Sequence, residues 1–163
     1  IEISAQEIDE VNVSSTKIRN SILDGNIDKA NDFLGRPFRI TGDVVKGNRL
    51  GRELGFPTLN LELSNDHKII PAEGVYAVEI CLMNVVYQGM MNIGKNPTVS
   101  EILERKYEVH VFDFDQDVYG EHVDILFHQF IRKEKTFDNL EELKSQIKED
   151  EKSIRHYFTS ANH

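Results

Sequence analysis

The chain has 163 residues, enough for one principal domain with a short appendage, and its 39% hydrophobic content can supply a core. No apolar run is long enough to span a bilayer, the single cysteine, Cys81, excludes an intrachain disulfide, and a formal net charge of -9 argues against broad nucleic-acid binding. We therefore expect a soluble cytoplasmic protein without nucleic-acid or membrane partners, and the first residue, Ile1, suggests a piece of a longer polypeptide.

Residues 14–34 carry the pattern of two short helices. The sequence DGN at 24–26 interrupts the helical period, which resumes at Ile27 and ends at Gly35. We expect this stretch to form a helical appendage to the main domain.

From Phe38 the pattern changes to short segments rich in Val, Ile, Tyr and Phe, separated by turn residues. Because no helices lie between them, these segments predict an antiparallel sheet. Closure into a small β-barrel would remove the edges of that sheet, so a mainly β fold is expected. The expected strands lie at 38–45, 58–61, 74–83, 85–94, 106–114 and 122–132.

The C-terminal stretch predicts an amphipathic helix that packs on the barrel. The sequence DNLE at 138–141 resembles a capping box, and the acidic run at 148–153 is interpreted as the solvated face of the helix. The apolar stripe comprises Leu140, Leu143, Ile147, Ile154 and Phe158.

Three glycines four residues apart, Gly47, Gly51 and Gly55, lie among basic residues just before a predicted strand. The stretch lacks the Lys-Ser or Lys-Thr pair of a P-loop, and the chain has no Gly-x-Gly-x-x-Gly fingerprint. The spacing alone leaves open a plain surface turn or a loop that wraps an anion. Thr58 and Asn60 follow, and strand alternation places their hydroxyl and amide on one face, where they can hold a hard divalent cation carrying nucleotide phosphates.

Glu108 lies in an unusually apolar strand for a carboxylate. The pattern leaves two interpretations open, a structural salt bridge or a base that takes a proton from an alcohol. Alternation puts Glu108 on one face with His110, Phe112 and Phe114, opposite Tyr107, Val109 and Val111.

Two other sequence patterns allow an ordinary structural explanation. Asp113, Asp115 and Asp117 mimic the start of a calcium loop, but the loop's required glycine is Val118 here, so a hairpin turn is expected. Met90 and Met91 offer either core packing or an apolar surface for a flat aromatic ligand.

Taken together and in order, these segments resemble the riboflavin kinase domain at the C-terminal end of bacterial bifunctional riboflavin kinase/FAD synthetases. The resemblance runs from Gly35 to about Phe158. It implies a six-stranded antiparallel Greek-key barrel at 35–163 that uses ATP and riboflavin to make FMN and ADP, with Mg²⁺ as the metal ion and Zn²⁺ or Mn²⁺ as alternatives. The matching pieces are GRPF (35–38), GDVVKGNRLGRELGFPTLN (42–60), PAEGVYAV (71–78), YQGMMNIGKNPTV (87–99), YEVHVFDFDQDVYG (107–120) and IRKEKTFDNLEELKSQIKED (131–150).

The resemblance also implies residue roles. Thr58 is similar to the family's metal ligand, Asn60 to its neighbour on metal or phosphate, and Glu108 to the general base, while Leu59 stands where the family usually has alanine. Implied nucleotide and phosphate contacts also include Gly47, Gly51, Arg52, Gly55 and Tyr119, and implied flavin contacts are Asn92, Ile93, Gly94 and Arg132.

Residues 1–34 resemble the end of the adenylyltransferase domain of the same enzymes. The sequence VSSTKIR at 13–19 matches the signature that closes that domain, with Val13 in place of isoleucine, but the domain's His-x-Gly-His motif is absent. The resemblance therefore implies a remnant that cannot transfer an adenylyl group alone, with the upstream domain as a partner in the full-length protein. A non-catalytic flavin- or nucleotide-binding module is the alternative function.

Overall fold

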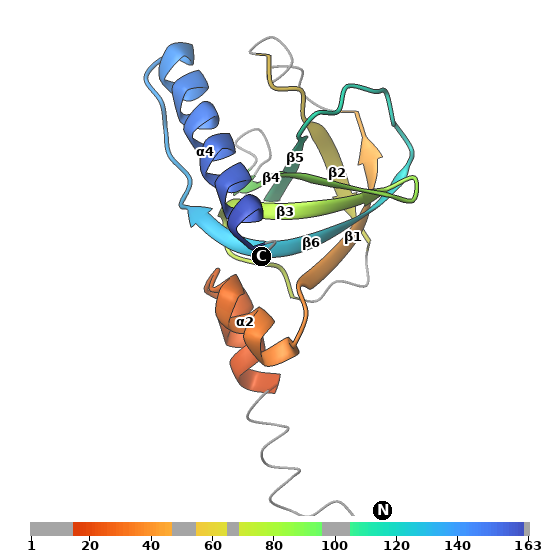
Figure 1. The fold of residues 1–163 in the computed structure, drawn as a ribbon, viewed down its shortest axis with the longest axis vertical. Helices are drawn as coiled ribbons and strands as arrows, with labels where there is room; N and C mark the ends of the chain where they lie inside the picture. Colours follow the sequence, from red (N-terminus) through yellow and green to blue (C-terminus); the bar gives the residue numbers. More distant parts are fainter. Residues whose placement is uncertain (1–14, 47–54, 65–68, 96–104, 162–163) are drawn as a thin grey trace, which may run out of the picture.

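The computed structural model describes residues 15–46, 55–64, 69–95 and 105–161. Six strands form a closed barrel in the order β1-β2-β5-β4-β3-β6, with every neighbouring pair antiparallel (Figure 1). β2 lies beside β5, and β6 lies beside β3, which is a Greek-key arrangement. The expected barrel is confirmed. Its strands are β1 Phe38–Val45, β2 Leu59–Leu63, β3 Gly74–Leu82, β4 Val85–Lys95, β5 Arg105–Val111 and β6 His122–Arg132.

Alternation along each strand fills the inside of the barrel. In β1, Ile40 and Val44 are buried whereas Arg39 and Asp43 face outward, because successive side chains of a strand point to opposite faces. The largest buried side chain, Tyr76, packs edge-on against neighbouring aromatic rings. Side chains of the main hydrophobic core therefore pack inside the barrel.

Two helical segments close one end of the barrel (Figure 1). Residues 15–23 are helical, and α2 Ile27–Leu34 follows after Gly25, whose φ of 82° suits glycine. Asn31 of α2 links the helix to the barrel, since its side chain donates to the Phe127 carbonyl and accepts from the Phe38 N–H, both at 2.8 Å. The helical appendage therefore packs on the barrel.

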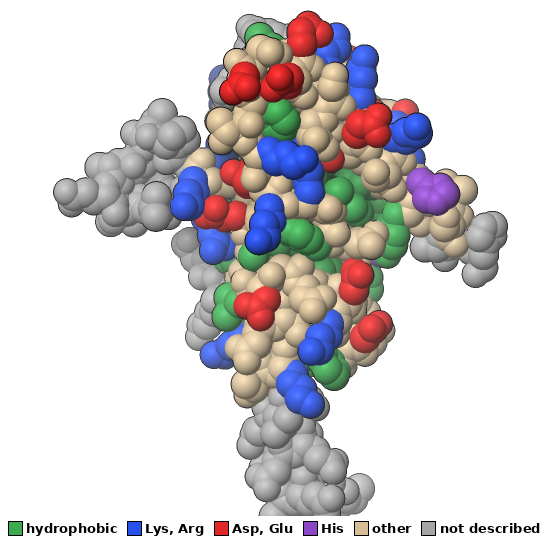
Figure 2. All heavy atoms as spheres, turned by 90° about the vertical axis from the view of Figure 1, so that its left-hand side faces the viewer, with side chains coloured by type: hydrophobic (Ala, Val, Ile, Leu, Met, Phe, Trp, Pro, Cys, Tyr) green, Lys and Arg blue, Asp and Glu red, His purple; other side chains and the backbone are tan. Residues whose placement is uncertain are grey.

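The C-terminal helix α4 Leu140–Ala161 runs along the outside of the barrel. Asn139 caps it by accepting the Glu142 N–H at 2.9 Å. Its outward side carries interspersed acidic and basic side chains (Figure 2). None of the helices in the described ranges is long and apolar enough to cross a membrane.

Two details of the expected helix are wrong. Leu140 is 53% exposed, because it begins the helix and lies beyond the barrel surface, so it does not belong to the buried stripe. Asp150 lies within the run interpreted as a solvated face, yet only 2% of it is exposed. Its carboxylate points toward the barrel and bonds Arg132.

The strand expected at 106–114 is also too long. β5 ends at Val111, and Asp113 adopts a positive φ of 59° that turns the chain. Phe114 consequently packs with Tyr87, at 5.0 Å between ring centres, against the main core. It does not share the face of Glu108.

Candidate active site

One row of side chains crosses five strands on the outer face of the barrel. Asn60 on β2 pairs with Glu108 on β5, and Glu108 pairs with Asn92 on β4. The row continues through Val75 on β3 to Arg132 on β6. Directly opposite residues of an antiparallel pair present their side chains on the same face. Residues far apart in the sequence therefore lie in one row. Four of them, Glu108, Asn92, Val75 and Arg132, line one cavity, whereas Asn60 is not part of its lining.

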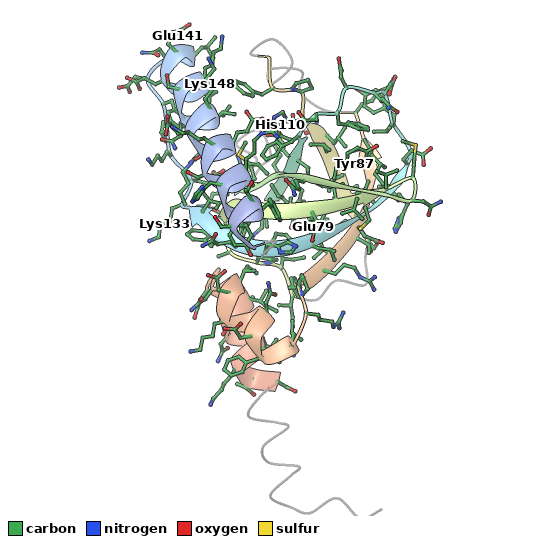
Figure 3. All side chains as sticks on the ribbon, viewed as in Figure 1. Glu79, Tyr87, His110, Lys133, Glu141 and Lys148 are labelled. Atoms are coloured by element: carbon green, nitrogen blue, oxygen red, sulfur yellow. The ribbon has the colours of Figure 1, made fainter. Side chains whose placement is uncertain are left out.

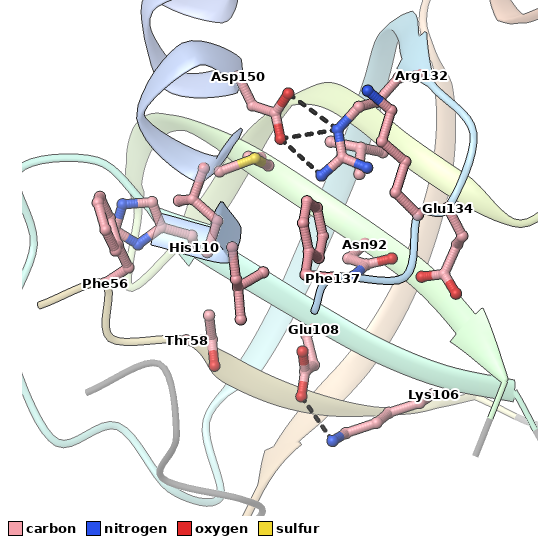
Figure 4. Close-up of a pocket in the computed structure, with 15 residues that line it drawn as sticks. Phe56, Thr58, Asn92, Lys106, Glu108, His110, Arg132, Glu134, Phe137 and Asp150 are labelled. Atoms are coloured by element: carbon pink, nitrogen blue, oxygen red, sulfur yellow. Dashed lines mark hydrogen bonds and ion pairs between the residues drawn. The ribbon is translucent and has the colours of Figure 1, made fainter. Parts of the chain in front are cut away.

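A cavity of about 240 Å³ lies between this row and the first half of α4 (Figure 4). Thr58, just before β2, reaches the same cavity as Glu108. Its apolar lining is Phe56, Val75, Met90, Phe137, Leu143 and Ile147, and its polar lining is Thr58, Asn92, Lys106, Glu108, His110, Arg132, Glu134, Lys135 and Asp150. The lysines and arginine of this lining balance its three carboxylates, so these groups carry no net formal charge.

Glu108 forms an ion pair along its own strand. Its Oε1 lies 2.8 Å from Lys106 Nζ, and the two side chains are 25% and 35% exposed. The structural salt bridge considered from the sequence thus exists. A pair so accessible to water contributes little stability, about 0–1 kcal/mol, so it is a weak reason for placing a carboxylate at this position.

Glu134 brings a second carboxylate to the cavity, from the segment between β6 and α4. Burial, followed by the nearby Glu73 carboxylate, raises the pKa of Glu134, while a hydrogen bond from Asn92 opposes the rise. Glu134 lies against Gly94, where an added Cβ would be only 2.6 Å from its Oε1. Asn92 Oδ1 is buried without a hydrogen-bond partner among the described residues, so the cavity wall holds an unused acceptor.

His110 positions the segment that carries Thr58. It lies on β5 on the side facing α4 (Figure 3), and its Nδ1 is 2.9 Å from the Pro57 carbonyl oxygen. Its ring also packs edge-on against Phe56, with 5.7 Å between ring centres. No group of three or more His, Cys, Asp or Glu side chains in the described part of the chain could hold a metal ion.

Arg132 and Asp150 form an ion pair with several hydrogen bonds at the cavity wall. Arg132 Nη2 donates to Asp150 Oδ2 at 2.8 Å, and its Nε donates to both carboxylate oxygens at 3.0 Å. The sequence interpretation missed Asp150, although a signal was present. Asp150 lies three residues after Ile147 and four before Ile154, which is within the apolar stripe.

The remaining predicted site residues are dispersed. Gly47, Gly51 and Arg52 lie outside the described residues. Gly55 is exposed, with a φ of 84°, and precedes Phe56 of the cavity. Tyr119 is 45% exposed and lies beside Lys46, whose Nζ is 5.9 Å from its ring centre.

Neighbouring positions on β4 divide between core and cavity. Met90 is buried in the cluster beneath α4 and also lines the cavity, whereas Met91 and Ile93 are fully buried in the barrel interior. Gly94 is buried against Glu134. The side chain of Ile93 therefore contributes to the core and is absent from the cavity lining.

The fold and the site define a small Greek-key barrel with a ligand cavity on its outer face, beneath a C-terminal helix. A family model described as "Flavokinase: Riboflavin kinase" matches residues 34–158. The chain therefore belongs to the riboflavin kinase family, as the sequence resemblance implied.

Individual proteins agree with this assignment. The bifunctional riboflavin kinase/FMN adenylyltransferase of Haemophilus influenzae is 39% identical over 154 residues, which cover 94% of this chain and 49% of that protein. The chain thus spans about half the length of the curated relatives it matches.

Solved structures share the fold. A Streptococcus pneumoniae structure described as a macrolide-efflux protein has a TM-score of 0.82 and 42% identity, covering 86% of this chain and 46% of that one. Riboflavin kinase from Trypanosoma brucei has a TM-score of 0.53 and 24% identity, covering 76% of this chain and 81% of that one, and at this identity it shows the fold alone.

Proposed function

We propose that this chain transfers the γ-phosphate of ATP to the 5′-hydroxyl of riboflavin, giving FMN and ADP. The observation that carries the residue assignment is the convergence of Glu108 and Thr58 on one cavity, with Asn60 opposite Glu108 in the sheet. A carboxylate beside hard oxygen donors is the arrangement that phosphoryl transfer to an alcohol requires.

The cavity suits the flavin better than the nucleotide. Polar residues are the more numerous in its lining, but most of the accessible wall area is apolar and the charged side chains balance, which favours an uncharged aromatic ring over a triphosphate. The triphosphate then lies on the Thr58 side, toward Gly55. Gly47, Gly51, Arg52 and Tyr119 remain proposed contacts to the nucleotide. Asn92 and Arg132 remain proposed side-chain contacts to the flavin, whereas for Ile93 and Gly94 only a backbone contact is proposed, because neither side chain lines the cavity.

Thr58 and Asn60 fit a magnesium ion by the chemistry of their donors. A hydroxyl and an amide carbonyl are hard oxygen ligands, and Mg²⁺ commonly keeps several waters while it binds one or two protein groups and the substrate phosphates. A cluster of carboxylates is therefore unnecessary. When bound, the ion supplies positive charge to the phosphate oxygens during transfer.

Glu108 acts as the general base. Its carboxylate accepts the proton of the 5′-hydroxyl as that oxygen attacks the γ-phosphorus, the bond to the bridging oxygen breaks, and ADP leaves. The residues that line the cavity hold the ring so that the ribityl chain ends at Glu108, and they exclude water from the transfer. Proton removal of this kind contributes about 10²–10⁴-fold in rate.

A turnover assay with Glu108→Gln tests this function. Purified chain with Mg²⁺ and ATP is expected to convert riboflavin to FMN, and the variant to lose about 10²–10⁴-fold in kcat while it still binds riboflavin. Glu62→Gln, the same change at an exposed site on β2, is the matched control and should behave like the wild type. Turnover by Glu108→Gln at the control rate would contradict the base assignment. Riboflavin binding without turnover by the wild type would establish the non-catalytic binding module instead.

We also propose that, in a longer parent protein, residues 1–34 close an upstream adenylyltransferase domain that converts FMN to FAD. The curated relatives carry both activities in their names, and the family match begins at residue 34. Adenylyl transfer is not expected from this chain alone. An assay for FAD formation from FMN and ATP should give no product, and FAD formation would contradict the proposal.

A further inference from the structure

Asp150 is almost fully enclosed, and its bonds tie two elements together. Its side chain is 3% exposed and that of Arg132 is 16% exposed. Gln146, one turn earlier on α4, donates a further hydrogen bond to Asp150 Oδ1 at 2.9 Å. The carboxylate on α4 is therefore locked to the end of β6 in one geometry.

Stability alone is a poor reason for such a pair. Removing two charges from water costs several kcal/mol per ion, and apolar side chains of similar volume often replace a buried pair without loss of stability. A well-bonded buried pair is better suited to fixing the orientation of one of its members. Both carboxylate oxygens of Asp150 already accept hydrogen bonds and its side chain is only 3% exposed, so the oriented member is Arg132.

Arg132 has hydrogen-bonding capacity left for a ligand. A guanidinium has five N–H groups. Bonds to Asp150 use Nε–H and one N–H of Nη2, and the Lys133 carbonyl accepts one from Nη1 at 3.1 Å. Within the described residues, one N–H on each terminal nitrogen is without a partner. Arg132 also lines the cavity beside Phe137, with 6.0 Å from the guanidinium carbon to the ring centre (Figure 4).

We propose that Asp150 is a positioning residue for the flavin: it holds the Arg132 guanidinium at the cavity wall so that the two remaining N–H groups donate to oxygens of the bound flavin. The isoalloxazine carbonyls and the ribityl hydroxyls are the acceptors of the required kind. The inference rests on the proposed function, because it takes riboflavin as the occupant of this cavity. Asp150 itself touches neither substrate.

Asp150→Asn in the full chain tests the proposal, with riboflavin binding read from quenching of flavin fluorescence. The amide keeps the size of the side chain but replaces the charged acceptor, so Arg132 loses its fixed orientation. We expect the riboflavin Kd to rise about tenfold or more, while kcat at saturating riboflavin stays within about threefold because Glu108 is untouched. Glu149→Gln removes a negative charge from the adjacent exposed position and should leave Kd unchanged.

The double variant Arg132→Met/Asp150→Leu separates positioning from a purely structural role. An apolar pair of similar volume should keep Tm close to that of the wild type, yet binding should be at least as weak as in Asp150→Asn. Wild-type affinity in either variant would overturn the proposal, even if Tm fell. Binding does not require turnover, so a wild type that binds riboflavin but makes no FMN refutes the catalytic function and leaves this test intact. A wild type that binds no riboflavin refutes both.

Discussion

The two halves of α4 meet the same barrel in different ways. In the second half, Ile154 and Phe158 are buried in one cluster with Met90 and Phe112. In the first half, Leu143 and Ile147 are only partly buried and face the cavity. The helix is thus anchored at one end and serves as a cavity wall at the other. We therefore expect residues for stability and residues for binding to be separable along one helix.

Phe158→Ala should give the largest effect on folding. It removes a ring that is 5% exposed and packs 5.2 Å from the His128 ring, so we expect a loss of about 3–5 kcal/mol in the free energy of unfolding. Urea unfolding measures the loss, and Phe33→Ala, at a ring 43% exposed on α2, is the control. A tenfold weaker riboflavin affinity in the still-folded variant would remove the distinction between the two halves.

Leu143→Ala should have the opposite effect, a small loss of stability and a large loss of riboflavin affinity. Its side chain is only partly buried, so a loss of about 1 kcal/mol in stability is expected, whereas riboflavin affinity should fall about 5- to 30-fold because an apolar wall of the cavity is lost. Leu140→Ala, at an exposed position on the same helix, is the matched control. Unchanged affinity together with a large stability loss would show that the first half is also an anchor.

Glu134→Gln should produce a smaller effect that depends on pH. Burial raises the pKa of Glu134, so the folded state holds this proton more tightly than the unfolded state does. Its contribution to stability is present below the unfolded pKa and is lost as the pH rises through the raised value. The Tm of the variant relative to wild type should therefore increase from pH 4 to pH 8. A difference that stays constant with pH would contradict this assignment, and Glu141→Gln, the same change at an exposed position on α4, is the control.

Asp113→Asn should give the smallest effect on stability. Asp113 pairs with Arg155, which lies in the second half of α4. The hydrogen bond and charge of Arg155 lower the pKa of Asp113, so the interaction stabilises the fold above the ordinary aspartate pKa and is lost as the pH falls through the lowered one. Both groups are well exposed, so salt should weaken the effect. A small Tm difference at pH 7 that vanishes in acid or high salt is expected. A difference that persists under both conditions would indicate a non-electrostatic cause.

The barrel could be predicted from the sequence, because the alternation of apolar residues and the turn residues are local signals. Ile40 and Val44 in β1, or Val109 in β5, mark the inner face through spacing alone. The end of β5 was harder to predict, because the positive φ of Asp113 is a turn conformation that an aspartate can adopt but does not require.

The site could be predicted only in part, because its geometry depends on the register of the strands. The sequence predicts that Thr58, Asn60 and Glu108 matter, but only pairing across the sheet places Asn60 opposite Glu108. Asp150 was missed because neighbouring acidic residues suggested a solvated face. Its spacing from Ile147 and Ile154 was the better guide, since position around a helix decides burial more directly than local charge does.

A crystal structure with riboflavin, ADP and Mg²⁺ tests the central claim most directly. The account predicts an isoalloxazine ring in the cavity between Met90 and the first half of α4, with the ribityl 5′-oxygen within hydrogen-bond reach, about 2.6–3.2 Å, of Glu108. The metal should lie at Thr58. Flavin bound outside this cavity, or a 5′-oxygen remote from Glu108, would contradict the account.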